Sequence, residues 1–313
     1  MILCAGENLI DMIQQGPARD GVPEFRAIVG GSPYNCARAL GRLGATVGYL
    51  TPISTDRMGD LLAEALAADG VALLGGRSPR PTSLALVALD RGQPRYQFYR
   101  DGVADRDITP EGLRASLPSA ARALHLGSAA LIEGADADAL AALAAEARGR
   151  GLFISVDPNV RPVLLGGDDA AYRARLAQVF AAADVIKISD EELAWWDPGR
   201  DVAAAAAALF AAAGPGLLVV TRGAESVIAH HPGGRQEVPA APVAALVDTV
   251  GAGDTFMAAL LDGLAGDEAL DGAALAALSS TRLGNILDRA ARAAAITCTR
   301  AGCNPPRRSE LDG

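Results

Sequence analysis

Short apolar runs alternate with longer helical patterns along most of this chain, and no other feature restricts its fold as strongly. Apolar runs that predict strands occupy residues 1–5, 47–52, 123–127, 152–156, 185–188 and 217–221. Helical spacing of apolar residues predicts helices over 33–43, 58–69, 136–149, 170–183, 201–213, 254–264 and 278–296. Strands that alternate with helices form parallel sheets covered on both faces. We therefore predict a three-layer α/β/α fold with a mostly parallel central sheet.

Two segments, at approximately residues 12–29 and 83–103, interrupt this alternation. The first is rich in glycine, proline and charge, and the second alternates between apolar and polar residues like a hairpin. Period-two spacing places Tyr96, Phe98 and Arg100 on one face of the hairpin. We expect these segments to form a small antiparallel lid beside the main sheet, although a surface hairpin without a role has the same pattern.

Composition limits the function classes. The 313 residues suffice for one large domain, and we expect a single domain over residues 1–313. The formal net charge of −9 argues against nucleic acid or an anionic membrane as the main partner. The sequence has neither a leader-like start nor an apolar run of about 18 residues, which predicts a cytoplasmic protein. The four cysteines form no CxxC pair and there are only three histidines, so we expect free thiols rather than zinc.

The segment Gly251-Ala252-Gly253-Asp254 predicts chemistry at the start of a helix. Its small residues let backbone N–H groups approach an anion, and the helix dipole favours negative charge at the same place. Asp254 could orient and deprotonate an attacking hydroxyl, although its position in the first turn should make it a weak base. Together these features indicate phosphoryl transfer to an alcohol. A plain helix cap is the alternative interpretation.

A second glycine pair, Gly30-Gly31, precedes the helix that begins near Pro33. It would let the backbone approach a sugar, and Asn35 offers both a donor and an acceptor. This pattern also occurs at structural loop-to-helix junctions.

Residues 248–256, Asp-Thr-Val-Gly-Ala-Gly-Asp-Thr-Phe, resemble the C-terminal signature of the ribokinase-like (phosphofructokinase-B-type) carbohydrate kinases. Gly30-Gly31…Asn35 resembles their N-terminal signature, and the ending from Thr297 to Pro306 is similar to that of the fructokinase subgroup. The resemblance runs from Gly6 to Pro306. It implies that Asp11, at the end of the first strand, holds sugar hydroxyls together with Gly31 and Asn35.

The resemblance also implies an ATP site with Mg²⁺. Residues 157–161, Asp-Pro-Asn-Val-Arg, and 187–192, Lys-Ile-Ser-Asp-Glu-Glu, each follow a strand, and Glu192 would organise Mg²⁺ through water. Thr221 and Gly223 resemble a phosphate-binding turn in which Ser226 replaces the usual second glycine, so the shape of that turn is an open question. The ATP-binding residues implied are Asn159, Lys187, Ser189, Thr221, Gly223, Gly251 and Gly253. A monovalent cation, commonly K⁺ in relatives, would lie near Asp248, Val250, Thr297 and Gly302.

The identity of the sugar depends on weaker signals. Tyr99, Arg100 and Arg161 resemble residues that hold a carboxylate in relatives acting on 2-keto-3-deoxygluconate, but they are equally compatible with neutral hydroxyls. The sequence around the tail favours fructose. Ribose or nucleoside kinases and a catalytically silent sugar-binding regulator are further alternatives. A Rossmann oxidoreductase is disfavoured because no G-x-G-x-x-G follows the first strand. Relatives often dimerise through their lids, which makes a homodimer a further expectation.

Overall fold

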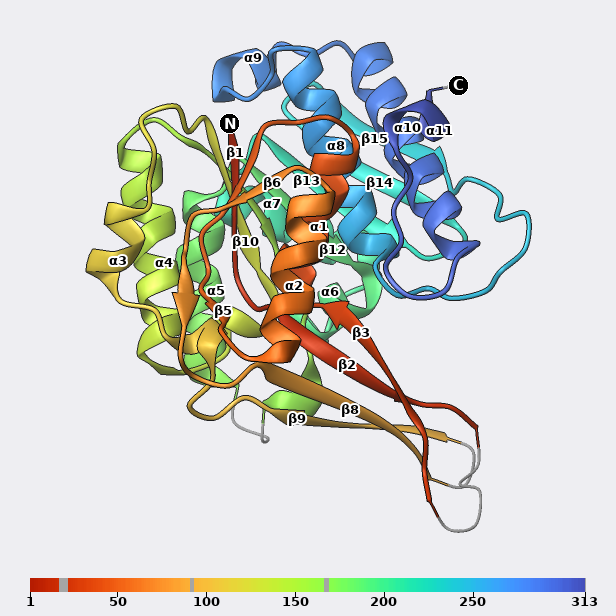
Figure 1. Ribbon diagram of the computed structural model, residues 1–313. Helices are drawn as coiled ribbons and strands as arrows, with labels where there is room; N and C mark the ends of the chain where they lie inside the picture. Colours follow the sequence, from red (N-terminus) through yellow and green to blue (C-terminus); the bar gives the residue numbers. More distant parts are fainter. Residues whose placement is uncertain (17–21, 91–92, 166–168, 313) are drawn as a thin grey trace.

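A nine-stranded sheet forms the centre of the computed structural model, which describes residues 1–16, 22–90, 93–165 and 169–312 (Figure 1). Its strands in spatial order are β15 (Gly234–Pro239), β14 (Ser226–His231), β13 (Leu217–Arg222), β12 (Val185–Ser189), β11 (Phe153–Asp157), β10 (Ala123–Gly127), β1 (Ile2–Ala5), β4 (Val47–Tyr49) and β6 (Val71–Leu73). Neighbours from β13 to β6 pair in parallel, whereas β14 and β15 pair antiparallel at one edge.

Helices cover both faces of this sheet, so the predicted three-layer fold is confirmed. Buried residues of one face belong to α1 (Ser32–Arg42), α2 (Arg57–Ala68), α8 (Ala252–Gly266), α9 (Gly272–Ala276), α10 (Ser280–Cys298) and α11 (Arg308–Leu311). Those of the other face belong to α3 (Pro110–Ala115), α4 (Gly134–Gly149), α5 (Ala170–Ala182), α6 (Asp190–Trp196) and α7 (Val202–Ala213). Strand β1 serves both, because Ile2 and Cys4 join the first core and Leu3 and Ala5 the second.

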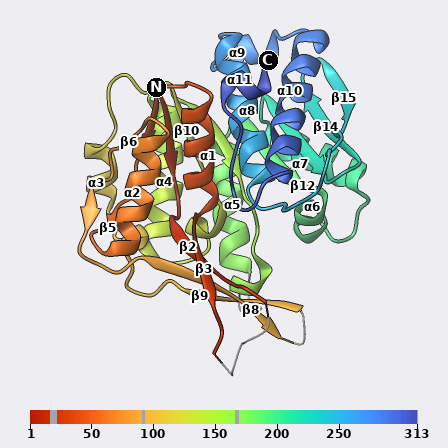
Figure 2. The ribbon, with the colours of Figure 1, turned by 45° about the vertical axis from the view of Figure 1, so that its right-hand side comes forward.

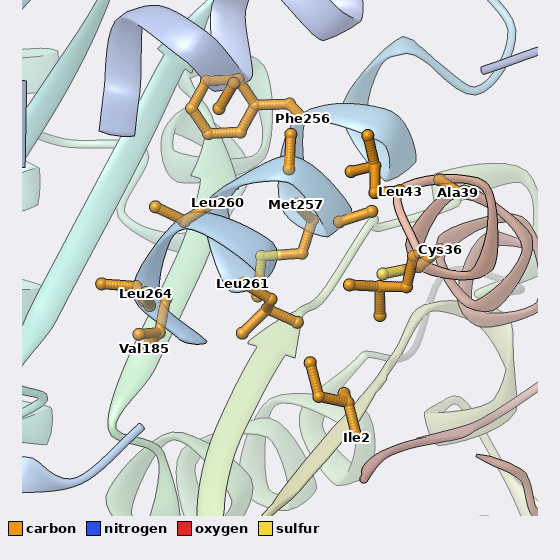
Figure 3. Packing of buried hydrophobic residues seen from close by; sticks show 14 of the residues in the cluster. Ile2, Cys36, Ala39, Leu43, Val185, Phe256, Met257, Leu260, Leu261 and Leu264 are labelled. Carbon is orange, nitrogen blue, oxygen red and sulfur yellow. The ribbon is translucent and has the colours of Figure 1, made fainter. Parts of the chain in front are cut away.

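Helix α8 is buried around almost its whole circumference, because it lies between the sheet, α1 and α10. Figure 3 shows Phe256, Met257, Leu260, Leu261 and Leu264 of α8 in the same cluster as Cys36 and Ala39 of α1 and Leu43, which follows α1. Each such large side chain contributes roughly 1.5–3 kcal/mol when it leaves water. This packing fixes α8 against α1, so that the first turns of both helices meet at the edge of the sheet where the parallel strands end.

The two segments that interrupt the alternation form a second sheet, here called the lid sheet, which projects from the main body (Figure 2). Its strands in spatial order are β3 (Phe25–Gly30), β2 (Leu9–Gln14), β8 (Ser83–Asp90) and β9 (Gln93–Tyr99). The expectation of a wholly antiparallel sheet is wrong, because the central pair β2–β8 is parallel. The chain passes through α1, β4 and α2 between these strands, and so long a crossover permits parallel pairing. A small parallel pair joins β5 (Ile53–Ser54), which precedes α2, with β7 (Arg77–Ser78), which precedes β8.

Most predicted element ends differ from the observed ones by one or two residues. The helix predicted from residue 254 begins at Ala252, which places Asp254 within its first turn. The hairpin of β14 and β15 was not predicted, since its polar edge strand lacks a clear apolar alternation. None of the helices in the described ranges is long and apolar enough to cross a membrane.

Candidate active site

Asp254 lies at the meeting point of α8 and α1. Its Oδ1 accepts a hydrogen bond of 2.6 Å from Ser32 Oγ, and its Oδ2 accepts one of 2.8 Å from Asn35 Nδ2. Ser32 and Asn35 belong to the first turn of α1, so the contact joins residues more than 200 positions apart in the sequence. Only 7% of Asp254 is exposed. The carboxylate is therefore held in one orientation by two donors on a neighbouring helix.

Burial decides the acidity of this carboxyl group. It raises the pKa of Asp254 from 3.8 to about 6, although the hydrogen bonds from Ser32 and Asn35 oppose the rise. The nearby carboxylate of Asp157 raises this pKa further, and Lys187 lowers it. The sequence-based expectation of a weak base, drawn from the helix dipole, is wrong because loss of solvent outweighs the dipole at this position. Asp254 is ionised at neutral pH and basic enough to take up a proton.

The N-terminus of α8 lacks the side-chain cap found on several other helices. Asp56, Asp201 and Ser279 cap α2, α7 and α10, whereas α8 starts at Gly251 with a φ of 76° and no capping side chain. Among the described residues, the N–H groups of Gly251 and Gly253 have no hydrogen-bond partner. The N–H of Ala252 donates to the carbonyl of Thr249 at 3.2 Å, so it is the one predicted donor already engaged. Two free amides beside Asp254 make an anion site.

The tail of the chain closes over this N-terminus. A side chain on Gly251 would meet the Cys303 sulfur at 2.3 Å, so no larger residue fits there without movement. Asp248 links the loop to the tail by accepting hydrogen bonds from the N–H groups of Gly302 at 2.8 Å and Val250 at 3.0 Å. The structure thus brings together three of the residues expected near a monovalent cation.

Thr297, the fourth of that group, lies on the last turn of α10. Its hydroxyl donates to the carbonyl of Ala293 at 3.1 Å and lies within hydrogen-bonding distance, 3.0 Å, of the hydroxyl of Thr255. The next carbonyl, of Cys298, accepts the N–H groups of Val247 at 2.9 Å and Asp248 at 3.3 Å. All four predicted positions are therefore close to one another.

Lys187 lies on the other side of Gly253, with its Nζ 3.0 Å from the place a side chain on that glycine would take. Its ammonium group pairs with Asp157 Oδ2 at 2.8 Å, and both side chains are buried. Burial raises the pKa of Glu192, and Asp157 raises it further while Lys187 lowers it. Two acids and one ammonium group leave a net negative charge next to the anion site, which suits a divalent cation carried with phosphate.

Glu192, beside Lys187 and Asp157, also holds the backbone by two hydrogen bonds. Its two oxygens accept hydrogen bonds from the N–H groups of Ser189, at 2.7 Å, and Val160. Ser189 in turn caps α6 by accepting the Glu192 N–H, which completes a capping box. The Oδ1 of Asp157 is buried without a partner among the described residues, and no separate role was predicted for Asp157 from the sequence. It is the more available carboxylate oxygen of this cluster.

The sugar side of the site is built from the start of the lid sheet. Asp11 was expected at the end of the first strand, but β1 ends at Ala5 and Asp11 lies in β2 of the lid sheet. A side chain on Gly30 would meet Asp11 Oδ2 at 2.4 Å. Burial raises the pKa of Asp11 to about 6, Arg161 lowers it, and the charge of Asp254 raises it. The two aspartates therefore face the same space.

Glu7 organises this region and was missed by the sequence analysis. Its Oε1 accepts the N–H of Ser32 at 3.0 Å and its Oε2 accepts the N–H of Ala130 at 3.2 Å. Gly31 has a φ of 108°, and a side chain there would meet the Glu7 carbonyl at 2.3 Å. The one available signal was a charged residue two positions after the end of a buried apolar strand, where solvation alone seldom explains a charge.

The remaining predicted sugar ligands differ in their exposure and in whether they already have a hydrogen-bond partner. Asn35 Oδ1 is buried without a partner among the described residues, which leaves it open to a hydroxyl group. Tyr99, at the end of β9, is 49% exposed. Arg161 is exposed and donates to Asn159 Oδ1 at 2.6 Å. Arg100 is engaged by Asp105, as described below.

The predicted phosphate-binding turn joins β13 to β14. Thr221 is the penultimate residue of β13, and Gly223 follows with a φ of 52°. Ser226 starts β14, and its hydroxyl donates to Glu237 Oε1 at 2.7 Å. Since Ser226 has no positive φ, serine fits this place without strain. The side chain of Tyr96 lies outside the described residues, so its predicted face is not assigned.

Comparison with known proteins identifies the family. The model of the pfkB family of carbohydrate kinases matches residues 1–310. The chain belongs to this family. It is 39% identical to the fructokinase of Rhizobium leguminosarum bv. trifolii over 91% of this chain and 86% of that protein. It is 36% identical to a fructokinase of Klebsiella pneumoniae, with 83% of each chain covered.

Solved structures agree with the family. The fructokinase of Xylella fastidiosa with bound ATP superposes with a TM-score of 0.89 at 31% identity, covering 99% of this chain and 96% of that one. A double mutant of the fructokinase of Vibrio cholerae O395, in its fructose, ADP and potassium ion bound form, has a TM-score of 0.83 at 24% identity, with 99% and 96% covered. The second likeness concerns the fold alone. The family match over residues 1–310 and the fructokinase relatives place the chain among the sugar phosphotransferases.

Proposed function

We propose that this protein transfers the γ-phosphoryl group of ATP to the 6-hydroxyl of fructose, giving fructose 6-phosphate and ADP. The observation that carries the proposal is a buried Asp254 held by Ser32 and Asn35 directly beside two free amides of α8. Fructose is the sugar named for the relatives that share 39% and 36% of their aligned residues with this chain.

In the proposed reaction, the sugar oxygen forms a bond to the γ-phosphorus while the bond from phosphorus to the ADP oxygen breaks. The hydroxyl proton passes to Asp254, whose pKa of about 6 keeps it ionised at neutral pH. The N–H groups of Gly251 and Gly253 stabilise the negative charge on the transferred group. Asp11 and Asn35 hold the neighbouring hydroxyls so that the attacking oxygen is in line.

Lys187, Asp157 and Glu192 suit the triphosphate and its Mg²⁺. Among the described residues no three acidic, histidine or cysteine side chains converge into a ready-made metal site. Mg²⁺ commonly binds through one or two carboxylates with water and phosphate oxygens, and the free Oδ1 of Asp157 supports such an arrangement. When bound, Mg²⁺ neutralises phosphate charge. Thr221 and Gly223, at the turn between β13 and β14, are proposed to hold the phosphates together with Lys187.

A monovalent cation is proposed near Asp248, Val250, Thr297 and Gly302. The hydrogen bonds that tie the loop to the tail keep these residues together, and a cation there would add positive potential behind the anion site. Turnover measured in K⁺, Na⁺ and choline salts of equal ionic strength tests this proposal. Equal rates in all three would remove it.

The substrate assignment is tested with purified protein, ATP and a panel of fructose, 2-keto-3-deoxygluconate, ribose and adenosine. We expect ADP release to be fastest with fructose and the phosphate to be found on the 6-oxygen by ³¹P and ¹³C NMR. Faster ADP release with another member of the panel would replace fructose by that sugar. Binding of fructose without ADP release would instead support a sugar-binding regulator.

Two further proposals concern the state of the protein. We place it in the cytoplasm, because all four of its cysteines are free and buried. We also propose a homodimer in which the lid sheets of two copies pair, since β3 and β9 are its open edges. Sedimentation equilibrium distinguishes this dimer from a monomer.

A further inference from the structure

The guanidinium group of Arg100 occupies the base of the lid sheet, directly after β9. Its Nη2 donates to Asp105 Oδ2 at 3.1 Å and its Nη1 donates to the carbonyl of Ala129 at 2.9 Å. The side chains of Arg100 and Asp105 are only 11% and 0% exposed. Burial raises the pKa of Asp105, and the Arg100 guanidinium opposes this rise because it favours the ionised carboxylate. Arg100 and Asp105 therefore form a buried ion pair.

Asp105 is held firmly in this place. Its Oδ1 accepts a hydrogen bond from the hydroxyl of Ser83, the first residue of β8. The preceding N–H, of Ala104, donates to the carbonyl of Pro81 at 2.9 Å. Asp105 thus binds the two lower ends of the lid hairpin, one through Ser83 and the other through Arg100.

A chain of hydrogen bonds connects this pair to the catalytic aspartate. Ala129 accepts from Arg100, and the next N–H, of Ala130, donates to Glu7. Glu7 binds the N–H of Ser32, whose hydroxyl binds Asp254. The ion pair is therefore connected to the sugar side of the site through Glu7, whose charge acts on both Asp105 and Asp11.

We propose that Asp105 makes the site selective for neutral sugars over sugar acids, by neutralising Arg100. This inference concerns the substrate class and rests on the proposed sugar kinase activity. A guanidinium group without a counter-ion is the best protein partner for a substrate carboxylate. Once paired with a buried carboxylate, it offers no net charge, and the carboxylate repels a second anion. The Nε of Arg100, which has no partner among the described residues, remains a donor suited to a hydroxyl group.

The charges around the site act in the same direction. Glu7, Asp11 and Asp254 lie on the sugar side, and Glu7 raises the pKa of both Asp11 and Asp105. Against these acids stands the exposed Arg161. Removal of one acid that binds a guanidinium should therefore change the discrimination between a neutral and an anionic sugar of the same shape.

The test compares gluconate with glucitol, an acid and a neutral polyol of similar size, as competitive inhibitors against fructose. In Asp105→Asn, which keeps the shape of the side chain, the ratio of the gluconate to the glucitol inhibition constant should fall about tenfold or more. In the double variant Arg100→Gln/Asp105→Asn the ratio should return to that of the unmodified protein. An unchanged ratio in folded Asp105→Asn overturns the proposal.

Asp107→Asn is the matched control. Asp107 is two residues away and pairs with Arg80 at 3.2 Å and with Ser78, but it does not touch Arg100. Its removal deletes the same charge from the same segment and should leave the ratio unchanged. A fall as large as that of Asp105→Asn would mean that net charge alone decides, and would also overturn the proposal.

Two measures keep this test separate from that of the reaction. If Asp105→Asn does not fold, Asp105→Ser, which can still bond Ser83, carries the same comparison. If the unmodified protein does not phosphorylate fructose, calorimetric binding of gluconate and glucitol still decides the role of Asp105, while the reaction assignment falls on its own.

Discussion

The floor of the site and the lid sheet are built in opposite ways. On the floor, Ser32, Asn35 and Asp254 are each less than 10% exposed and bind one another through their side chains. In the lid sheet, β3 is largely half-buried or exposed, and Tyr99 at the end of β9 is 49% exposed. The floor rests on a core of large apolar side chains, whereas few of the side chains described for the lid sheet are buried.

This difference assigns separate tasks to the two regions. The carboxylate that must be correctly placed during phosphoryl transfer is fixed before substrate binds, since Ser32 and Asn35 already donate to both oxygens of Asp254. The lid sheet has little buried surface to lose when it moves, so it can close over a sugar at low cost. Changes on the floor should therefore affect turnover, and changes in the lid should affect substrate binding.

The largest effect is expected for Asp254→Asn. Turnover should fall about 10³-fold or more, because the amide cannot accept the hydroxyl proton. The fold should persist, and the melting temperature at pH 7.5 should not fall. With its pKa raised to about 6, the Asp254 charge costs stability above that pH and the cost vanishes on acidification, so a neutral residue removes it. Steady-state kinetics and thermal melts check both statements. Near-normal turnover would exclude Asp254 as the base.

Gly251→Ala should lower turnover about a hundredfold, since the added carbon meets the Cys303 sulfur and displaces the free amides. Gly70→Ala is the matched control. Both glycines have a φ of 76°, but nothing lies within 4 Å of a side chain at Gly70. The two variants share the backbone strain, so a difference in kcat between them reports the clash at the anion site. Equal kcat values would contradict this account.

The pH dependence of kcat/KM should be smaller but diagnostic. It should fall below about pH 6, because both Asp11 and Asp254 are then protonated, by about tenfold per pH unit for each proton required. Ser32→Ala removes a hydrogen bond that favours the ionised Asp254 and should move the fall to higher pH. A profile in Ser32→Ala that coincides with that of the unmodified protein would show that Ser32 does not act on the base.

Tyr99→Ala should have the smallest effect. The side chain is half-exposed in the lid sheet, so the melting temperature should change little and KM for the sugar should rise about threefold with kcat unchanged. Measurement of kcat and KM separates this result from a fall in kcat. A fall in kcat alone would place Tyr99 with the floor.

The fold could be predicted from the sequence, and so could those site residues that belong to a local sequence pattern. Asp254, Gly251 and Gly253 could be found because a glycine-rich loop before a helix is a feature of neighbouring residues. No role was predicted for Ser32, since its partner Asp254 lies 222 positions away.

The features that were missed depend on tertiary contacts. Glu7 looks like an ordinary polar residue until α1 and the loop after β10 are brought to it. The pairing of Arg100 with Asp105 depends on the turn that follows the lid hairpin. The parallel pairing of β2 with β8 depends on a crossover of the chain through the main body. The acidity of Asp254 was misjudged because burial cannot be read from a helix position.

The contact of Cys303 with Gly251 has a consequence for synthesis. Residues from both early and late parts of the sequence line the site, and the tail segment from Thr297 to Cys303 is made after Gly251 and Asp254. While the ribosome still holds that segment, Asp248 lacks the Gly302 amide and Gly251 lacks its cover. A nascent chain with its sheet already formed would therefore hold no working site, and ATP in the cell would be safe from it until translation of the tail is finished.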